Sequence, residues 1–176
     1  MMIRLMTVLG AACLSACAST LPNGAAPVAS LYSFNDTARF MLRDVCLASV
    51  IEGVPLAQKA DVPAVYPDER GRGWRAGPGS AVTVSAQPNG GCIFKVDRGI
   101  AMDLRKALQR EIDRSPAGFQ MRGYEEHAGE MTETYCASKS GYPAGLSVTL
   151  WARTDDPDYA TLLVSADVTT GSGTCG

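Results

Sequence analysis

The sequence lacks most of the motifs that mark common enzyme classes. It has a single histidine, His127, which leaves little for histidine-dependent catalysis. It contains no Gly-x-Ser-x-Gly, P-loop, His-Glu-x-x-His or Cys-x-x-Cys motif, which disfavours the hydrolase, nucleotide-binding, metalloprotease and dithiol redox classes. We therefore expect a protein that is not an enzyme and that binds no cofactor and no metal.

A strong charge of one sign is also lacking. The formal net charge is −2 and charged residues make up 19% of the chain, so nothing in the sequence favours a nucleic-acid partner. The apolar fraction of 46% excludes a collagen, a coiled coil and a wholly disordered chain. A chain of 176 residues with this composition predicts one globular domain.

The first apolar run is typical of an export signal. Leu5 to Ala12 is too short to cross a bilayer as a helix, which needs about 20 residues. Arg4 precedes the run and supplies the positive charge of a signal peptide. We expect residues 1–16 to be removed, residues 17–30 to form a flexible tether, and residues 31–176 to form the domain.

The end of this signal resembles the lipobox of bacterial lipoproteins, in the residues Leu14-Ser15-Ala16-Cys17. The resemblance implies cleavage before Cys17, lipidation of its sulfur and usually a fatty acid such as palmitate on its amine. Two or three acyl chains anchor a protein firmly. Ala18 then implies the periplasmic face of the outer membrane in a diderm cell. The alternative is a soluble periplasmic protein, because Ala16-Cys17-Ala18 also fits an ordinary signal-peptidase site.

Four cysteines remain after the signal and Cys17: Cys46, Cys92, Cys136 and Cys175. An even number in an oxidising compartment favours disulfides, and four cysteines allow three pairings. We prefer Cys46–Cys92 and Cys136–Cys175, because Cys175 lies on a glycine-rich tail that could fold back onto a strand. A four-thiolate zinc site is disfavoured, since its ligands usually come in close pairs.

Two main helices are predicted by apolar periodicity. The first spans Asp36 to Glu52 and ends at Gly53, and a short helix follows from Pro55 to Ala60. The second spans about Gly99 to Ser115. Its polar side chains are expected to face water: Arg105, Lys106, Gln109, Arg110 and Asp113.

Six strands are predicted by alternation of apolar and polar residues. The first two, Val82 to Gln87 and Cys92 to Val96, flank Asn89-Gly90 and are expected to pair antiparallel. Four more follow: Phe119 to Tyr124, Met131 to Ala137, Leu146 to Ala152 and Ala160 to Val168. The order α-β-β-α-β-β-β-β predicts an α+β fold with two main helices on one face of an antiparallel sheet of about six strands.

Two groups of side chains are candidates for binding or chemistry. Arg72 and Arg75 flank Trp74 in a predicted loop from Asp61 to Gly79, where they could contact an anion or a sugar ring, or simply cover the domain edge. The second group has the densest titratable side chains: Glu125, Glu126, His127 and Glu130. A solvated hairpin tip is the simpler interpretation of this group.

We expect a membrane-anchored envelope lipoprotein with a non-enzymatic binding or structural role toward an envelope protein or a cell-wall component. One alternative is a periplasmic inhibitor of a cell-wall hydrolase, a class of similarly small, disulfide-bearing lipoproteins. Another is an unusual hydrolase that uses the Glu125–Glu130 cluster.

Overall fold

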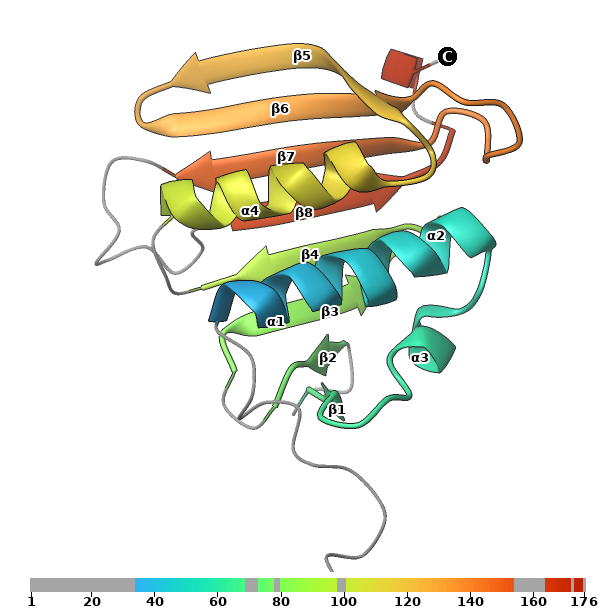
Figure 1. Ribbon diagram of the computed structural model, residues 1–176, viewed down its shortest axis with the longest axis vertical. Coiled ribbons are helices and arrows are strands. Elements are labelled where there is room, and N and C mark those ends of the chain that lie inside the picture. Colours follow the sequence, from blue (N-terminus) through green and yellow to red (C-terminus); the bar gives the residue numbers. More distant parts are fainter. Residues whose placement is uncertain are drawn as a thin grey trace, which may run out of the picture.

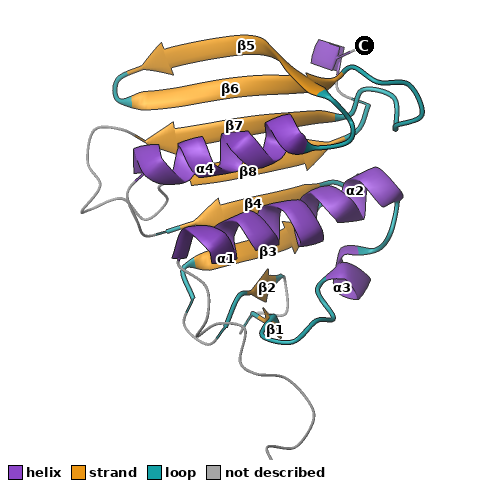
Figure 2. Cartoon of the chain, viewed as in Figure 1, coloured by secondary structure: helices purple, strands orange, loops and turns teal. Residues whose placement is uncertain are grey.

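The computed structural model describes residues 34–68, 73–77, 80–97, 101–153, 164–171 and 173–175. Within them the chain forms an eight-stranded antiparallel sheet with helices against one of its faces (Figures 1 and 2). The predicted mixture of helices and antiparallel strands is confirmed. The predicted signal peptide (1–16), the tether (17–30) and the start of the last predicted strand (160–163) lie outside the described residues.

The first helical segment is not one α-helix. It consists of α1 (Phe34–Phe40), a π-helical stretch η2 (Met41–Leu47) and α2 (Ala48–Glu52). Its buried residues include a series at every fourth position: Ala38, Leu42, Cys46 and Val50. In an α-helix that spacing drifts by about 40° per step, and the wider π turn compensates for the drift. The expectation of two main helices is therefore wrong, because only α4 (Ala101–Arg114) is a substantial α-helix in the described chain.

The sheet has eight strands rather than about six. The two additional strands, β1 (Tyr66–Pro67) and β2 (Trp74–Arg75), lie in the segment that was expected to be a loop. Each has only two residues, which is too short to show alternation in the sequence. The other six strands are β3 (Val82–Ala86), β4 (Cys92–Val96), β5 (Phe119–His127), β6 (Glu130–Ala137), β7 (Ser147–Arg153) and β8 (Val164–Thr169).

The strand order is β1-β2-β3-β4-β8-β7-β6-β5. The chain crosses from β4 through α4 to the far edge, and then returns strand by strand until β8 pairs with β4. This last pairing joins two halves, one containing β1–β4 and the other β5–β8. The antiparallel β3–β4 hairpin around Asn89-Gly90 is confirmed, and Gly90 takes the left-handed conformation that its turn requires (φ 81°).

The core lies between the helices and the sheet. The first helical segment covers β3 and β4, and α4 covers β7 and β8 (Figure 1). Phe94, Leu104 and Leu150 are among its fully buried side chains. A short α3 (Leu56–Lys59) follows Pro55 at the end of the first helical segment, as predicted. A final 3₁₀ turn, η3 (Gly173–Cys175), brings Cys175 back to β6.

Candidate functional site

Two disulfides are present, as predicted, in the preferred pairing. Cys46 on η2 is bonded to Cys92 on β4, and both side chains are fully buried. Cys136 on β6 is bonded to Cys175 on η3, on the side of the sheet away from the helices. In both pairs the Cα atoms are 5.5 Å apart, an ordinary separation for a disulfide.

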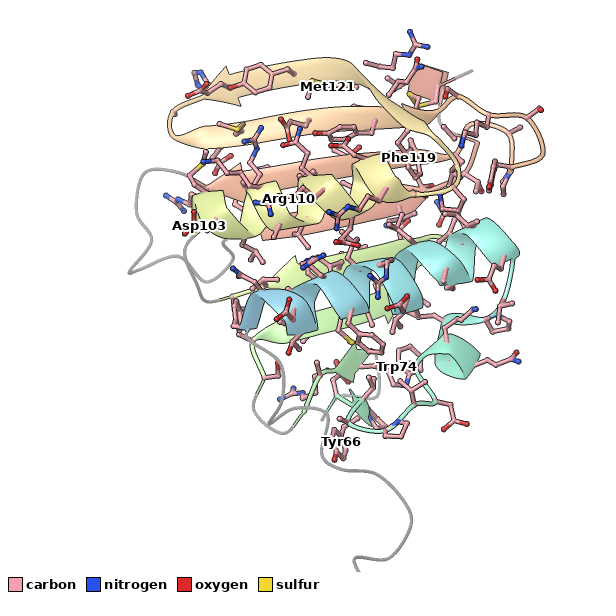
Figure 3. All side chains as sticks on the ribbon, viewed as in Figure 1. Tyr66, Trp74, Asp103, Arg110, Phe119 and Met121 are labelled. Carbon is pink, nitrogen blue, oxygen red and sulfur yellow. A yellow bond between two sulfur atoms is a disulfide. The ribbon has the colours of Figure 1, made fainter. Side chains whose placement is uncertain are left out.

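Trp74 lies on β2, whose position depends on the preceding glycine. A Cβ atom at Gly73 would collide with the carbonyl oxygen of Val84 on β3. The missing side chain therefore lets the backbone run close beside β3, where Trp74 is in register with Val84. Trp74 is half-buried and packs against the edge of the core, on the side of α3 (Figure 3).

A pocket of about 540 Å³ opens beside Trp74, and we call it the Trp74 pocket. Its walls come from five parts of the chain: the end of α2 with the start of α3, β2, the end of β3 with the β3–β4 turn, Pro143 and Thr170. Most of its side chains are apolar, including Val50, Leu56 and Trp74. None of the described residues that line it is charged.

The polar groups of the Trp74 pocket lie where its walls meet. The Ser49 hydroxyl donates to the carbonyl oxygen of Val54 at 2.8 Å and so fixes the turn after α2. The Asn89 Oδ1 atom accepts from the Gly91 N–H at 3.0 Å, and its Nδ2 atom donates to Thr169 Oγ1 at 3.1 Å. The pocket thus combines an indole ring with a neutral polar rim.

The structure brings together only part of the predicted ligand-binding group. Arg75 is in register with Thr83 on β3 and is not among the residues that line the pocket. Arg72 lies outside the described residues, as does Cys17. Asn89 and Thr170, which sequence reasoning missed, reach the pocket from a turn and from the end of β8. No local sequence signal could have placed Thr170 beside Trp74, because strand order alone decides it.

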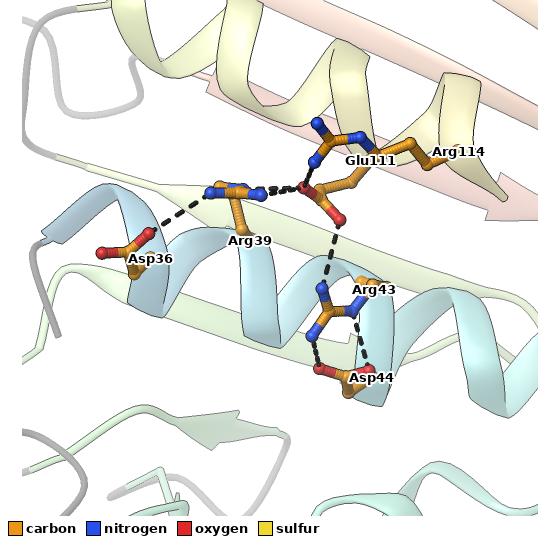
Figure 4. Close-up of polar contacts among 6 residues, drawn as sticks. All are labelled: Asp36, Arg39, Arg43, Asp44, Glu111 and Arg114. Atoms are coloured by element: carbon orange, nitrogen blue, oxygen red, sulfur yellow. Dashed lines mark hydrogen bonds and ion pairs between the residues drawn. The ribbon is translucent and has the colours of Figure 1, made fainter.

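A buried carboxylate lies between the first helical segment and α4 (Figure 4). Glu111 is 1% exposed, and Arg39 donates from Nε to its Oε1 atom at 2.7 Å. Arg43 and Arg114 approach the same carboxylate at 3.4 and 3.5 Å, while Asp44 binds Arg43 from the other side. The hydrogen bond with Asp44 is the main cause of a raised pKa at Arg43. This cluster holds the helices together.

A second buried carboxylate ties α4 to the sheet. Glu133 on β6 is 1% exposed and accepts two hydrogen bonds from Arg105 and one from the Tyr135 hydroxyl at 3.0 Å. The expectation that Arg105 faces water is therefore wrong, because the chain pairs it with an inward-facing carboxylate. Burial and the nearby Glu133 raise the pKa of Tyr135. One signal was available, since Glu133 alternates with Met131 and Tyr135 on the apolar face of its strand.

The Glu125–Glu130 cluster occupies the tip of the β5–β6 hairpin. The strand continues through His127, so Glu125 and His127 share a face of the sheet and Glu130 is in register with His127. Glu126 lies on the other face and accepts a hydrogen bond from Tyr124, which raises the pKa of that tyrosine. All four cluster residues are exposed, and no metal-binding group of three or more His, Cys, Asp or Glu residues occurs in the described chain.

Comparison of the chain with protein-family models, with curated proteins and with solved structures found no match. None of the helices in the described part of the chain is long and apolar enough to cross a membrane. The function is therefore inferred from the cysteine pairing and from the Trp74 pocket.

Proposed function

We propose that this protein is a lipid-anchored component of the cell envelope with a non-enzymatic role, and that its domain binds an envelope partner through the Trp74 pocket. The pairing of the cysteines carries this proposal. Cys46, Cys92, Cys136 and Cys175 are bonded to one another, so none of their thiols is available to Cys17. The Cys17 thiol is then left for the thioether that the lipobox resemblance implies.

The same bonds support the compartment that we propose. Disulfides between cysteines 46 and 39 positions apart suit an oxidising environment such as the periplasm. The tether (17–30) would give the domain freedom to reach its partner from the anchor.

A binding role is supported by the distribution of charge inside the domain. The two buried carboxylates, Glu111 and Glu133, are both occupied by arginine partners and hold the helices in place. The Trp74 pocket has a volume within the range of small-molecule sites, about 300–1,000 Å³, and the described residues that line it are uncharged. This combination favours recognition of a neutral partner over acid–base chemistry.

The proposal is tested by the intact mass of the full chain taken from the membrane fraction of a diderm host. We expect a chain that begins at Cys17, carries added acyl mass, and takes up four alkyl groups only after reduction. The Cys17→Ser variant should lose the acyl mass and the membrane association while retaining both disulfides.

Two results would contradict the proposal. A soluble chain that begins at Ser19 without acyl mass would show ordinary secretion into the periplasm. Alkylation of the four cysteines without reduction would show that the disulfides do not form in the cell, and the envelope assignment would fail with them.

A further inference from the structure

We propose that the Trp74 pocket binds a neutral saccharide, with one pyranose ring stacked on the indole of Trp74. This inference rests on the proposed function, because it names the class of envelope partner that the domain would bind. It is carried by the charge, the shape and the polar rim of the pocket.

The described residues that line the pocket favour a ligand without charge. The chain has 16 basic and 18 acidic residues, yet none of the described residues that line the pocket is among them. A carboxylate, phosphate or ammonium group that entered would lose water without gaining an ion-pair partner among these residues, which is costly. The described part of the lining therefore favours a neutral occupant.

The distribution of apolar and polar groups favours a sugar over an acyl chain. Trp74, Val54 and Pro55 supply accessible apolar surface, and a pyranose ring has an apolar C–H face that suits an indole. The Asn89 amide uses one N–H and one lone pair within the protein, which leaves one donor and further acceptor capacity. A sugar hydroxyl both donates and accepts and so matches that amide. An acyl chain would cover the rim and leave these groups unsatisfied.

The pocket is held in its shape before any ligand arrives. Gly91, which lines the pocket, directly precedes the disulfide-bonded Cys92, and a Cβ atom at Gly91 would come within 2.7 Å of the Val168 carbonyl oxygen. Ser49 and Val50 follow Cys46 on the same helical segment, so the disulfide connects two walls of the pocket. Binding therefore requires little ordering of the protein, which favours affinity.

The experiment uses the full chain in lipid nanodiscs, which avoids competition from free detergent. The chain has two tryptophans, and Trp151→Phe leaves Trp74 as the only one. We expect a saturable change of Trp74 fluorescence with a neutral tetrasaccharide. A β-1,4-linked N-acetylglucosamine tetramer represents wall glycan, and a neutral hexose tetramer represents surface polysaccharide. Binding of either one supports the inference and identifies the source.

Variants then locate the site by calorimetry. We expect Trp74→Ala to weaken saccharide binding at least about tenfold, and Asn89→Ala about fivefold. Trp74→Phe should bind with an intermediate affinity, and it keeps the test valid if Trp74→Ala does not fold. Trp151→Phe is the matched control, because Trp151 does not line the pocket, and it should bind like the unmodified chain.

Three results would overturn the inference: no saturable binding of either tetrasaccharide, binding that Trp74→Ala and Trp74→Phe leave unchanged, or Trp74-dependent binding of decanoate in place of saccharide. The intact mass of the same preparation separates this failure from that of the proposed function. Acyl mass on Cys17 without saccharide binding would overturn the saccharide inference alone. Saccharide binding without acyl mass would overturn the lipid anchor alone.

Discussion

The two halves of the domain attach a helix to the sheet by different chemistry. In the first half, the Cys46–Cys92 disulfide joins η2 covalently to β4 within the core. In the second half, the ion pair between Arg105 and Glu133 joins α4 to β6. The first attachment depends on the redox state of the compartment, whereas the second depends on the presence of both charges. Stability should therefore respond to oxidation in one half and to single charge deletions in the other.

The largest expected effect is the loss of a disulfide. Both bonds close loops of similar length, 46 and 39 residues, so the chain-entropy model assigns each about 4 kcal/mol of unfolding free energy. Replacing Cys46 and Cys92 by Ala should cost more, about 5 kcal/mol, because it also removes packed volume from the core. Replacing Cys136 and Cys175 by Ala should cost about 4 kcal/mol. Urea unfolding without reductant measures both.

The same two bonds should differ in their accessibility to a reductant. Cys46 and Cys92 are fully buried, whereas Cys175 is only half-buried at the end of the chain. Limited dithiothreitol followed by alkylation and peptide mapping should therefore modify Cys136 and Cys175 first. Simultaneous modification of all four would show that reduction requires global unfolding and would remove this distinction between the halves.

The next largest effect is expected at Glu133. Glu133→Ala should lower the free energy of unfolding by about 3 kcal/mol, because it leaves the Arg105 guanidinium largely buried without its partner. Replacing Glu133 by Leu together with Arg105 by Met should recover most of that loss, since no buried charge then remains unpaired. Glu125→Ala is the exposed control, and we expect a change within about 0.5 kcal/mol.

A smaller effect is expected at Glu111, although this carboxylate is equally buried. Its partners Arg39, Arg43 and Arg114 have side chains that are 31%, 53% and 65% exposed, against 14% for Arg105. Water can therefore replace the lost carboxylate more readily than at Arg105. Glu111→Ala should therefore lower the free energy of unfolding by about 1 kcal/mol. The loss should be smaller in 1 M salt, which screens the ion pairs. Urea unfolding of Glu111→Ala beside Glu133→Ala gives the comparison. Equal losses would show that exposure of the arginines does not decide the outcome.

Sequence patterns predicted the helices and strands that are long enough to display a periodic pattern of apolar residues. Six strands followed from alternation, and the β3–β4 hairpin followed from Asn89-Gly90. β1 and β2 were missed because two residues carry no period. The π-helical stretch was missed because residues spaced four apart stay on one face of an α-helix over one or two turns. They rotate away from that face only over several turns.

The candidate site was predictable only in part, because it depends on strand order. Trp74 stood out in the sequence as an aromatic residue between arginines, but its neighbours in the pocket come from residues 49–50, 53–57, 86, 89–91, 143 and 170. The pairing of β4 with β8 brings Thr170 to the β3–β4 turn, and no local pattern encodes that pairing. The buried Glu133 was detectable from its place on the apolar face of β6, but its partner Arg105 was not, since the contact is long-range.

The smallest expected effect concerns Tyr135, which contacts Glu133 in the second half of the domain, and it is expected at high pH. Burial, followed by the charge of Glu133 and the hydrogen bond to it, raises the pKa of Tyr135 above its ordinary value of 10.0. Below pH 10 the phenol keeps its proton in both states, so its contribution to stability is fully present. Above that pH the unfolded chain releases the proton first, and the stability contributed by Tyr135 falls. Tyr135→Phe should therefore be about 1 kcal/mol less stable at pH 8, and this difference should shrink by pH 11. Urea unfolding of both proteins at the two pH values measures it, and an unchanged difference would contradict the raised pKa.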